Sequence, residues 1–98
     1  MNKLKSDEID ALFEAILTLE NTDECYKFFE DACTIKELRD IAQRFHVARL
    51  LRDGGNYQEI NAKTGMSTAT ICRVNKCLNY GDGGYSTAID RLKEKGKI

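Results

Sequence analysis

Residues 68–76 combine small and basic side chains in the pattern of a helix that contacts nucleic acid. At about 100° per residue, one side of this helix gathers Thr68, Ala69, Cys72, Arg73 and Lys76. The opposite side carries Ile71, Val74 and Leu78 and suits a hydrophobic core. Small side chains allow a helix to enter a major groove about 12 Å wide, where Thr and Ala contact thymine methyl groups and Arg or Lys pairs with guanine or phosphate. The stretch therefore predicts a DNA-reading helix.

A second short helix is expected directly before the first. Asn56 with Glu59 resembles an N-terminal cap, Gly65 ends the helix after about Thr64, and Ser67 caps the next helix, which runs to about residue 79. Two short helices joined by a tight turn with glycine are typical of a helix-turn-helix, whose first helix can bind phosphate at its start. The predicted DNA-binding residues are Asn56, Tyr57, Gln58, Thr68, Ala69, Thr70, Cys72, Arg73 and Lys76.

The rest of the chain predicts further helices around this pair. There is no proline, and strand-like alternation of polar and apolar residues is absent, so the predicted fold class is all-α with six helices. The remaining predicted helices run from the Ser6 cap to about Leu19, from "NTDE" at 21–24, from the Thr34/Glu37 capping box to about Arg52, and from Ser86 to about Lys95, closed by Gly96. The long third helix is apolar nearly all round in its second half, so we expect neighbours on several of its sides.

Composition limits the class of protein. The 98 residues are 42% hydrophobic and 32% charged, which fits one globular domain. No apolar run approaches the roughly 20 residues of a membrane span, and the N-terminus lacks the apolar core of a signal peptide, so a cytoplasmic protein is expected. The net charge of -1 argues against coating nucleic acid through bulk positive charge, but residues 54–80 hold Lys63, Arg73 and Lys76 against Glu59. A two-fold dimer would double these cations.

Catalytic and metal-binding patterns are not found in the sequence. The four cysteines, Cys25, Cys33, Cys72 and Cys77, form no CxxC pair, so small packing residues are favoured over a disulfide or a metal site. No Ser/His/Asp or Cys/His set stands at plausible positions, and an enzyme is not predicted. The single histidine, His46, is interpreted as a residue at a dimer seam rather than a ligand. Tyr80 and Tyr85 either pack the last helix or touch a phosphate.

The segment "CTIKELRDIAQRFHVARLLRDGGNYQEINAKTGMSTATICRVNKCL", residues 33–78, resembles the Trp repressor family, most sharply over "ATICRVNKCL" at 69–78. Within the family it looks most like the YerC/YecD-type TrpR-related proteins. The resemblance implies an intertwined homodimer in which the N-terminal helices of both chains interlock. It also implies a single Trp repressor-like domain over 1–98, with 1–53 and 85–98 as dimerisation core and 56–80 as the DNA-reading head.

The resemblance also implies positions for an effector. Family members that respond to tryptophan use a Thr, two Arg, a Ser and a Gly, which correspond here to Thr34, Arg44, Arg73, Cys77 and Val74. Val74 would fill the space that the indole needs, and a cysteine is a poor acceptor for an ammonium group. L-tryptophan is therefore not expected as a co-repressor, and no cofactor is predicted. Our hypothesis is that Val74 plugs the pocket. The DNA-reading head would then stay permanently in its DNA-binding arrangement or respond to another small effector. Three of these positions also have a structural explanation, with Thr34 as a cap, Arg44 as a partner of Asp40 and Val74 as a core residue.

These features predict a sequence-specific transcriptional regulator of the repressor type. It would bind double-stranded DNA at a roughly palindromic operator as a homodimer, through the helix-turn-helix. The alternative is a protein-interaction module on the same fold without operator binding. Such a module would have no need to keep the outer face of residues 68–76 small and basic.

Overall fold

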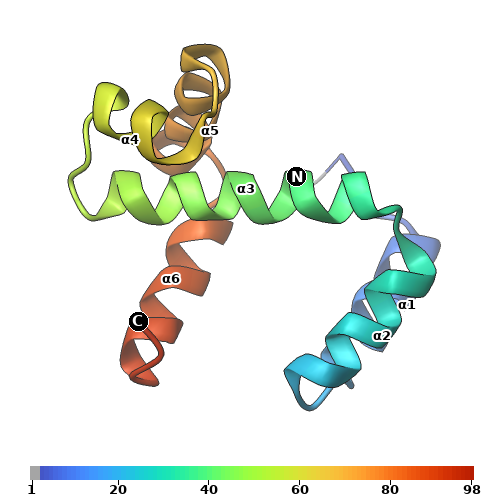
Figure 1. The fold of residues 1–98 in the computed structure, drawn as a ribbon. Coiled ribbons are helices and arrows are strands. Elements are labelled where there is room, and N and C mark those ends of the chain that lie inside the picture. The colour runs from blue at the N-terminus through green and yellow to red at the C-terminus, as the bar shows by residue number, and fades with distance from the viewer. Residues whose placement is uncertain (1–2) are drawn as a thin grey trace. The chain divides into compact units, whose positions relative to one another are not determined.

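The computed structural model describes residues 3–98, which form six α-helices and no strand. The helices are α1 (Asp7–Leu17), α2 (Thr22–Ala32), α3 (Ile35–Arg52), α4 (Tyr57–Thr64), α5 (Thr68–Tyr80) and α6 (Gly84–Glu94) (Figure 1). The prediction of an all-α chain with six helices is confirmed. Within these residues no helix has both the length and the apolar character needed to cross a membrane.

The last helix begins earlier than the predicted Ser86. Gly83 is its N-cap and adopts a left-handed conformation with φ of 86°, without a side-chain hydrogen bond to the helix. Because glycine has no Cβ, it takes this conformation at little cost, and the helix can start directly after it. A serine is a common N-cap, but here it lies inside the first turn of α6.

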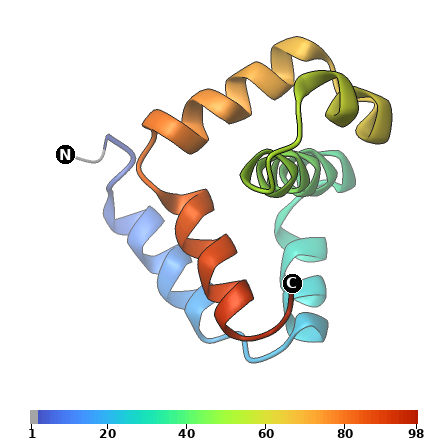
Figure 2. The ribbon, with the colours of Figure 1, turned by 90° about the vertical axis from the view of Figure 1, so that its left-hand side faces the viewer.

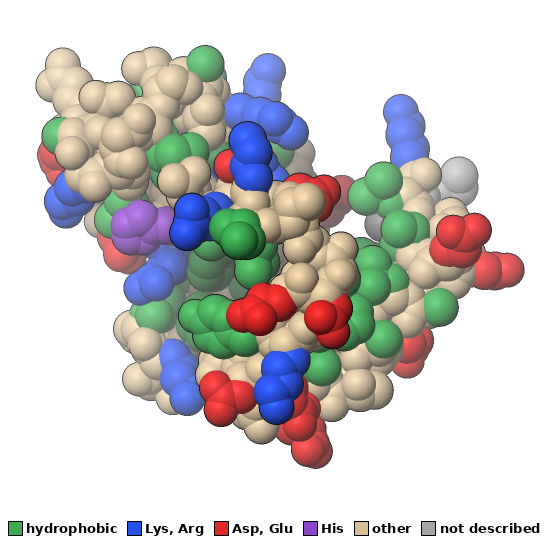
Figure 3. All heavy atoms as spheres, turned by 45° about the vertical axis from the view of Figure 1, so that its right-hand side comes forward, with side chains coloured by type: hydrophobic (Ala, Val, Ile, Leu, Met, Phe, Trp, Pro, Cys, Tyr) green, Lys and Arg blue, Asp and Glu red, His purple; other side chains and the backbone are tan. Residues whose placement is uncertain are grey.

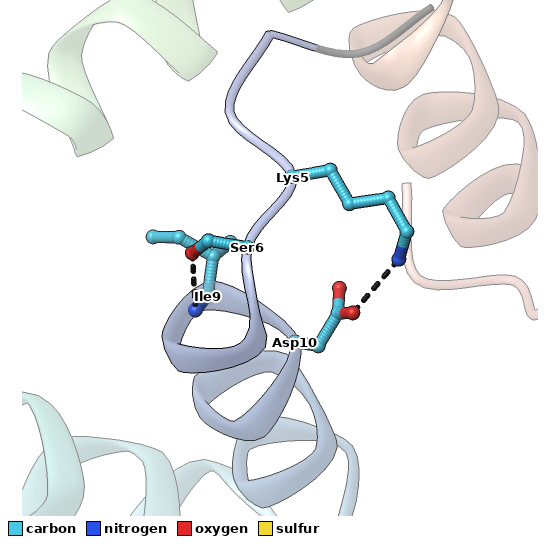
Figure 4. Close-up of polar contacts among 4 residues, drawn as sticks. All are labelled: Lys5, Ser6, Ile9 and Asp10. Carbon is cyan, nitrogen blue, oxygen red and sulfur yellow. Dashed lines mark hydrogen bonds and ion pairs between the residues drawn. The ribbon is translucent and has the colours of Figure 1, made fainter.

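Side-chain caps place the starts of the first three helices. The Ser6 hydroxyl accepts a hydrogen bond from the Ile9 N–H at 3.1 Å, and Lys5 pairs with Asp10 at 2.7 Å in the same turn (Figure 4). Asn21 caps α2 in the same way. The predicted capping box of α3 is present, because the Thr34 N–H donates to the Glu37 carboxylate at 2.9 Å and the Glu37 N–H donates to the Thr34 hydroxyl at 3.0 Å. The hydrogen bonds from the Thr34 backbone and side chain lower the pKa of Glu37.

The chain divides into two compact units, the first ending at Leu38 and the second comprising Arg39–Ile98. The first unit contains α1 and α2, neither of which has a buried residue. Phe28 and Phe29 pack edge to face with ring centroids 5.2 Å apart. Hydrophobic side chains of α1, such as Phe13 and Leu17, are exposed, and Figure 3 shows hydrophobic side chains at the surface in green. The unit by itself therefore leaves much apolar surface in contact with solvent.

The second unit holds the buried core of the described residues, to which each of its helices contributes. In Figures 1 and 2, α4 and α5 lie on one side of α3, and α6 leaves the end of α5 at a sharp turn. The buried side chains come from α3, α4, α5 and α6 and are Val47, Ala48, Ile60, Ile71, Val74 and Ile89. The expectation of neighbours on several sides of α3 is confirmed for its C-terminal half.

Two ion pairs and one ring contact join α6 to the region around the end of α3. Arg52 pairs with Asp90 at 2.6 Å, and Lys93 pairs with Asp53 at 3.7 Å. The ring of Tyr85 lies 6.3 Å from that of Phe45, and both residues pack against the core. Of the two roles considered for Tyr85, packing of the last helix is the one that the structure supports.

Candidate nucleic-acid interface

The turn between α4 and α5 is closed by hydrogen bonds from side chains of α4. Gly65 ends α4 in a left-handed conformation with φ of 71°, as the glycine at this position predicted. The Asn61 side-chain amide donates to the Met66 carbonyl at 2.7 Å. The Thr64 hydroxyl donates to the Ile60 carbonyl at 2.6 Å and accepts from the Met66 N–H at 3.1 Å. Both backbone polar groups of Met66 are therefore bonded, which holds α5 in a defined position against α4.

Ser67 begins α5 as predicted. Its hydroxyl oxygen accepts from the Thr70 N–H at 3.2 Å, and its O–H donates to the Thr70 hydroxyl at 3.0 Å. Ile71 and Val74, which are buried, fix the side of α5 that faces the core. The Ser67 cap and the two buried residues, Ile71 and Val74, together determine which side chains of α5 point outward.

The outer side of α5 carries the residues that the pattern placed there. Five of the predicted DNA-binding residues are exposed along it, namely Thr68, Ala69, Cys72, Arg73 and Lys76. Cys72 is a free thiol. Tyr80 is 87% exposed and lies three turns from Ala69 on the same side of the helix. Thr70 differs from these residues because it is half-buried and bonded to Ser67.

The three residues at the start of α4 have different surroundings. Gln58 is exposed. Asn56 is also exposed, but its side chain caps α4 by accepting from the Glu59 N–H at 2.9 Å and donating to the Glu59 carboxylate at 2.7 Å. Tyr57 is half-buried and packs against the core. Gln58 is therefore the side chain of this group that is best placed to reach a phosphate without breaking a contact with the protein.

Two of the five residues aligned with the effector positions line one cavity of the second unit. Arg44 of α3 and Arg73 of α5 border a cavity of about 220 Å³, which we call the Arg44–Arg73 hollow. Its lining is completed by Asp40, Gln43, Met66 and Thr70. No pattern in the sequence assigns these four residues to a pocket, although positions 40, 43 and 44 share one face of α3 by helical spacing.

The other three aligned residues lie elsewhere. Val74 is 1% exposed and belongs to the core. Cys77 is an exposed thiol beside a separate hollow of about 380 Å³ that Gly81, Asp82, Gly84 and Tyr85 also line. Thr34, in the first unit, caps α3. In the second unit, the structure therefore brings Arg44 and Arg73 together but places Val74 and Cys77 outside their hollow.

Comparisons with known proteins agree with this fold. The model of the family described as Trp repressor protein matches residues 7–93. The uncharacterized protein YerC of Bacillus subtilis (strain 168) is 53% identical over 94 residues, covering 96% of this chain and 90% of YerC.

Two solved structures are similar over almost their whole length. The crystal structure of a TrpR like protein from Eubacterium eligens has a TM-score of 0.89 and 53% identity, covering 95% of this chain and 96% of that one. The crystal structure of a putative Trp repressor from Staphylococcus aureus has a TM-score of 0.88 and 45% identity, covering 93% of this chain and 91% of that one. The similarity extends through all six helices, and the chain belongs to the Trp repressor family.

Proposed function

We propose that the protein is a sequence-specific DNA-binding transcriptional regulator, of the repressor type, that reads DNA through a helix-turn-helix formed by α4 and α5. The observation that carries the proposal is that the outer side of α5 exposes small and basic side chains. Thr68, Ala69 and Cys72 are small and exposed there, Arg73 and Lys76 are exposed cations, and the opposite side is anchored in the core. Small residues at the start of a rigidly held helix allow close approach to base edges, and the cations supply attraction to phosphate. Membership of the Trp repressor family supports the same reading.

The regulator acts as a homodimer in this proposal, with 1–53 and 85–98 as the dimerisation core and 56–80 as the reading head. The exposed hydrophobic residues of α1, among them Phe13 and Leu17, are of the kind that a second copy would cover. A net charge of -1 leaves one chain with little general attraction to DNA, and a two-fold dimer doubles the local cations of the α5 face. Two heads related by a two-fold axis also match a palindromic site.

DNA binding in this proposal does not depend on L-tryptophan. Val74 is buried in the core, at the position that the family resemblance assigns to the glycine of tryptophan-responsive members. The Arg44–Arg73 hollow is lined mainly by charged and polar side chains, which suits a small polar effector better than an indole.

Selection from a random duplex library tests the proposal. The purified full chain is equilibrated with the library at moderate salt, with and without L-tryptophan, and the retained DNA is sequenced. Enrichment of one two-fold symmetric site under both conditions is the expected result. Enrichment only with tryptophan would overturn the effector-independent part, and enrichment of no site would favour a protein-interaction module on the same fold.

A pair of matched variants locates the DNA-binding face. Ala69→Glu places a larger acidic side chain on the outer side of α5, and Ala88→Glu makes the same change at an exposed position of α6. Because like charges repel at the phosphate backbone, Ala69→Glu is expected to lower affinity for the selected site at least tenfold, roughly the effect of 1.4 kcal/mol. Because Ala88 lies in the proposed dimerisation core, Ala88→Glu is first shown to form the same oligomer by size-exclusion chromatography, and it should then bind like the unmodified protein. Equal affinities for the two variants would place the DNA elsewhere on the molecule.

A further inference from the structure

Asn61 bonds to both ends of the turn that precedes the reading helix. Its backbone carbonyl accepts from the Gly65 N–H at 2.8 Å, and its side-chain amide donates to the Met66 carbonyl at 2.7 Å. Met66 is followed directly by Ser67, the N-cap of α5. The Asn61 side chain is therefore a direct link between the body of α4 and the residue before the N-cap of α5.

The Met66 backbone is held by two α4 side chains while its own side chain packs inward. Its N–H donates to the Thr64 hydroxyl at 3.1 Å, and its side chain is half-buried against the core. The neighbouring Gly65 has φ of 71°, and a Cβ at this position would meet no atom within 4 Å, so no side-chain packing at residue 65 restrains the turn. The hydrogen bonds to Met66 supply the restraint that glycine does not.

We infer that Asn61 is a positioning residue for DNA reading, which acts through the Met66 carbonyl to set the direction of α5 and with it the approach of Thr68 and Ala69 to the bases. The inference rests on the proposed function. Asn61 is exposed, and an exposed amide beside a reading helix also has the chemistry of a direct adenine contact. One of its two side-chain N–H donors, however, already bonds the Met66 carbonyl at 2.7 Å, which fixes the orientation of the amide on the turn. Displacements of about 1 Å are enough to weaken a preorganised site, so a loosened turn reduces specificity without the loss of any base contact.

The test compares Asn61→Ala with Asn79→Ala. Asn79 is a matched control, because its side-chain amide donates to the Asn75 carbonyl at 2.9 Å within α5, outside the turn. Affinities of the full-length variants are measured for the selected site and for a scrambled duplex, over a series of salt concentrations. Asn61→Ala is expected to lower the ratio of specific to nonspecific affinity about fivefold, the effect of roughly 1 kcal/mol. Nonspecific affinity and the salt slope should stay unchanged, and Asn79→Ala should keep the original ratio.

Hydrogen exchange of the backbone amides of residues 66–69, measured without DNA, gives a second readout. Asn61→Ala should speed this exchange, while exchange within the core of α5 stays as in the unmodified protein. An unchanged specificity ratio or unchanged exchange would overturn the inference. Discrimination lost at a single base pair would show a direct base contact instead, and a salt slope smaller by about one would show a phosphate contact. If the unmodified protein preferred no sequence, the proposed function would fail, while faster exchange in Asn61→Ala would still establish the control of the turn by Asn61.

Discussion

Replacing Val74 with glycine tests whether this residue plugs an effector pocket or only fills the core. Val74 is 1% exposed, and the change removes its whole isopropyl group. Three buried carbons at about 0.8 kcal/mol each, with about 0.5 kcal/mol for glycine in place of valine in a helix, give a destabilisation of roughly 3 kcal/mol. Val47→Gly is the matched control, because Val47 is 0% exposed, lies within α3 and belongs to the same core cluster. Both variants should lose similar stability.

The two variants should differ in their response to L-tryptophan. Val74 is next to Arg73 in the sequence and one turn from Thr70, and both of these residues line the Arg44–Arg73 hollow. Its removal is therefore expected to extend this hollow into the core. A ligand that binds only the folded state stabilises it by about 2.7 kcal/mol at 100 times its dissociation constant, so saturating tryptophan should recover most of the stability that Val74→Gly loses. Val47→Gly and the unmodified protein should not respond.

Urea unfolding at one fixed protein concentration, followed by circular dichroism with and without L-tryptophan, provides the assay. A tryptophan-dependent rise in the unfolding midpoint for Val74→Gly alone is the expected result. If the midpoint of Val74→Gly is the same with and without millimolar tryptophan, the plug hypothesis is refuted and Val74 is a core residue only. A response in Val47→Gly as well would place tryptophan at a site unrelated to position 74.

Three further predictions concern a helix cap, a capping box and the DNA-binding face. Ser67→Ala removes the acceptor for the Thr70 N–H and should lower the free energy of unfolding by about 1 kcal/mol, as measured by urea titration; no change would show that another group caps α5. Because the folded-state pKa of Glu37 is lowered, its stabilisation is present above the unfolded pKa and is lost as the pH falls through the folded value. Unfolding of Glu37→Gln should therefore depend less on pH between about 3 and 6 than that of the unmodified protein, and equal pH dependence would contradict this. Lys76→Ala should weaken binding to all duplexes alike and reduce the salt slope by about one, whereas a loss confined to the selected site would show that Lys76 reads a base.

Local sequence signals predicted most of the helix starts. Ser6, Asn21, Asn56 and Ser67 each accept a hydrogen bond from a backbone N–H three residues later, and such caps depend on a few neighbouring residues. The sequence pattern puts the start of α6 too late, at Ser86, because a left-handed glycine can begin a helix without a side-chain signal. The sequence also predicts which residues lie on the outer side of α5, since helical periodicity alone separates Ala69 and Lys76 from Ile71 and Val74.

The surroundings of individual side chains depend on contacts between helices, which local patterns do not contain. Asn56 and Tyr57 stand next to each other at the start of α4, yet one caps the helix and the other packs against the core. The Arg44–Arg73 hollow joins α3 to α5 and includes Asp40 and Gln43, which only the packing of these helices brings near Arg73.

Local patterns in the sequence were enough to predict the helical fold class, the capped pair of short helices and the small, basic outer side of α5, because caps and periodicity act over a few residues. The packed structure was needed to show that Arg44 and Arg73 share one hollow and that Tyr57 packs against the core. These relations depend on the angle and distance at which helices pack. Those quantities follow from side-chain volumes across the whole core rather than from any one stretch of the chain.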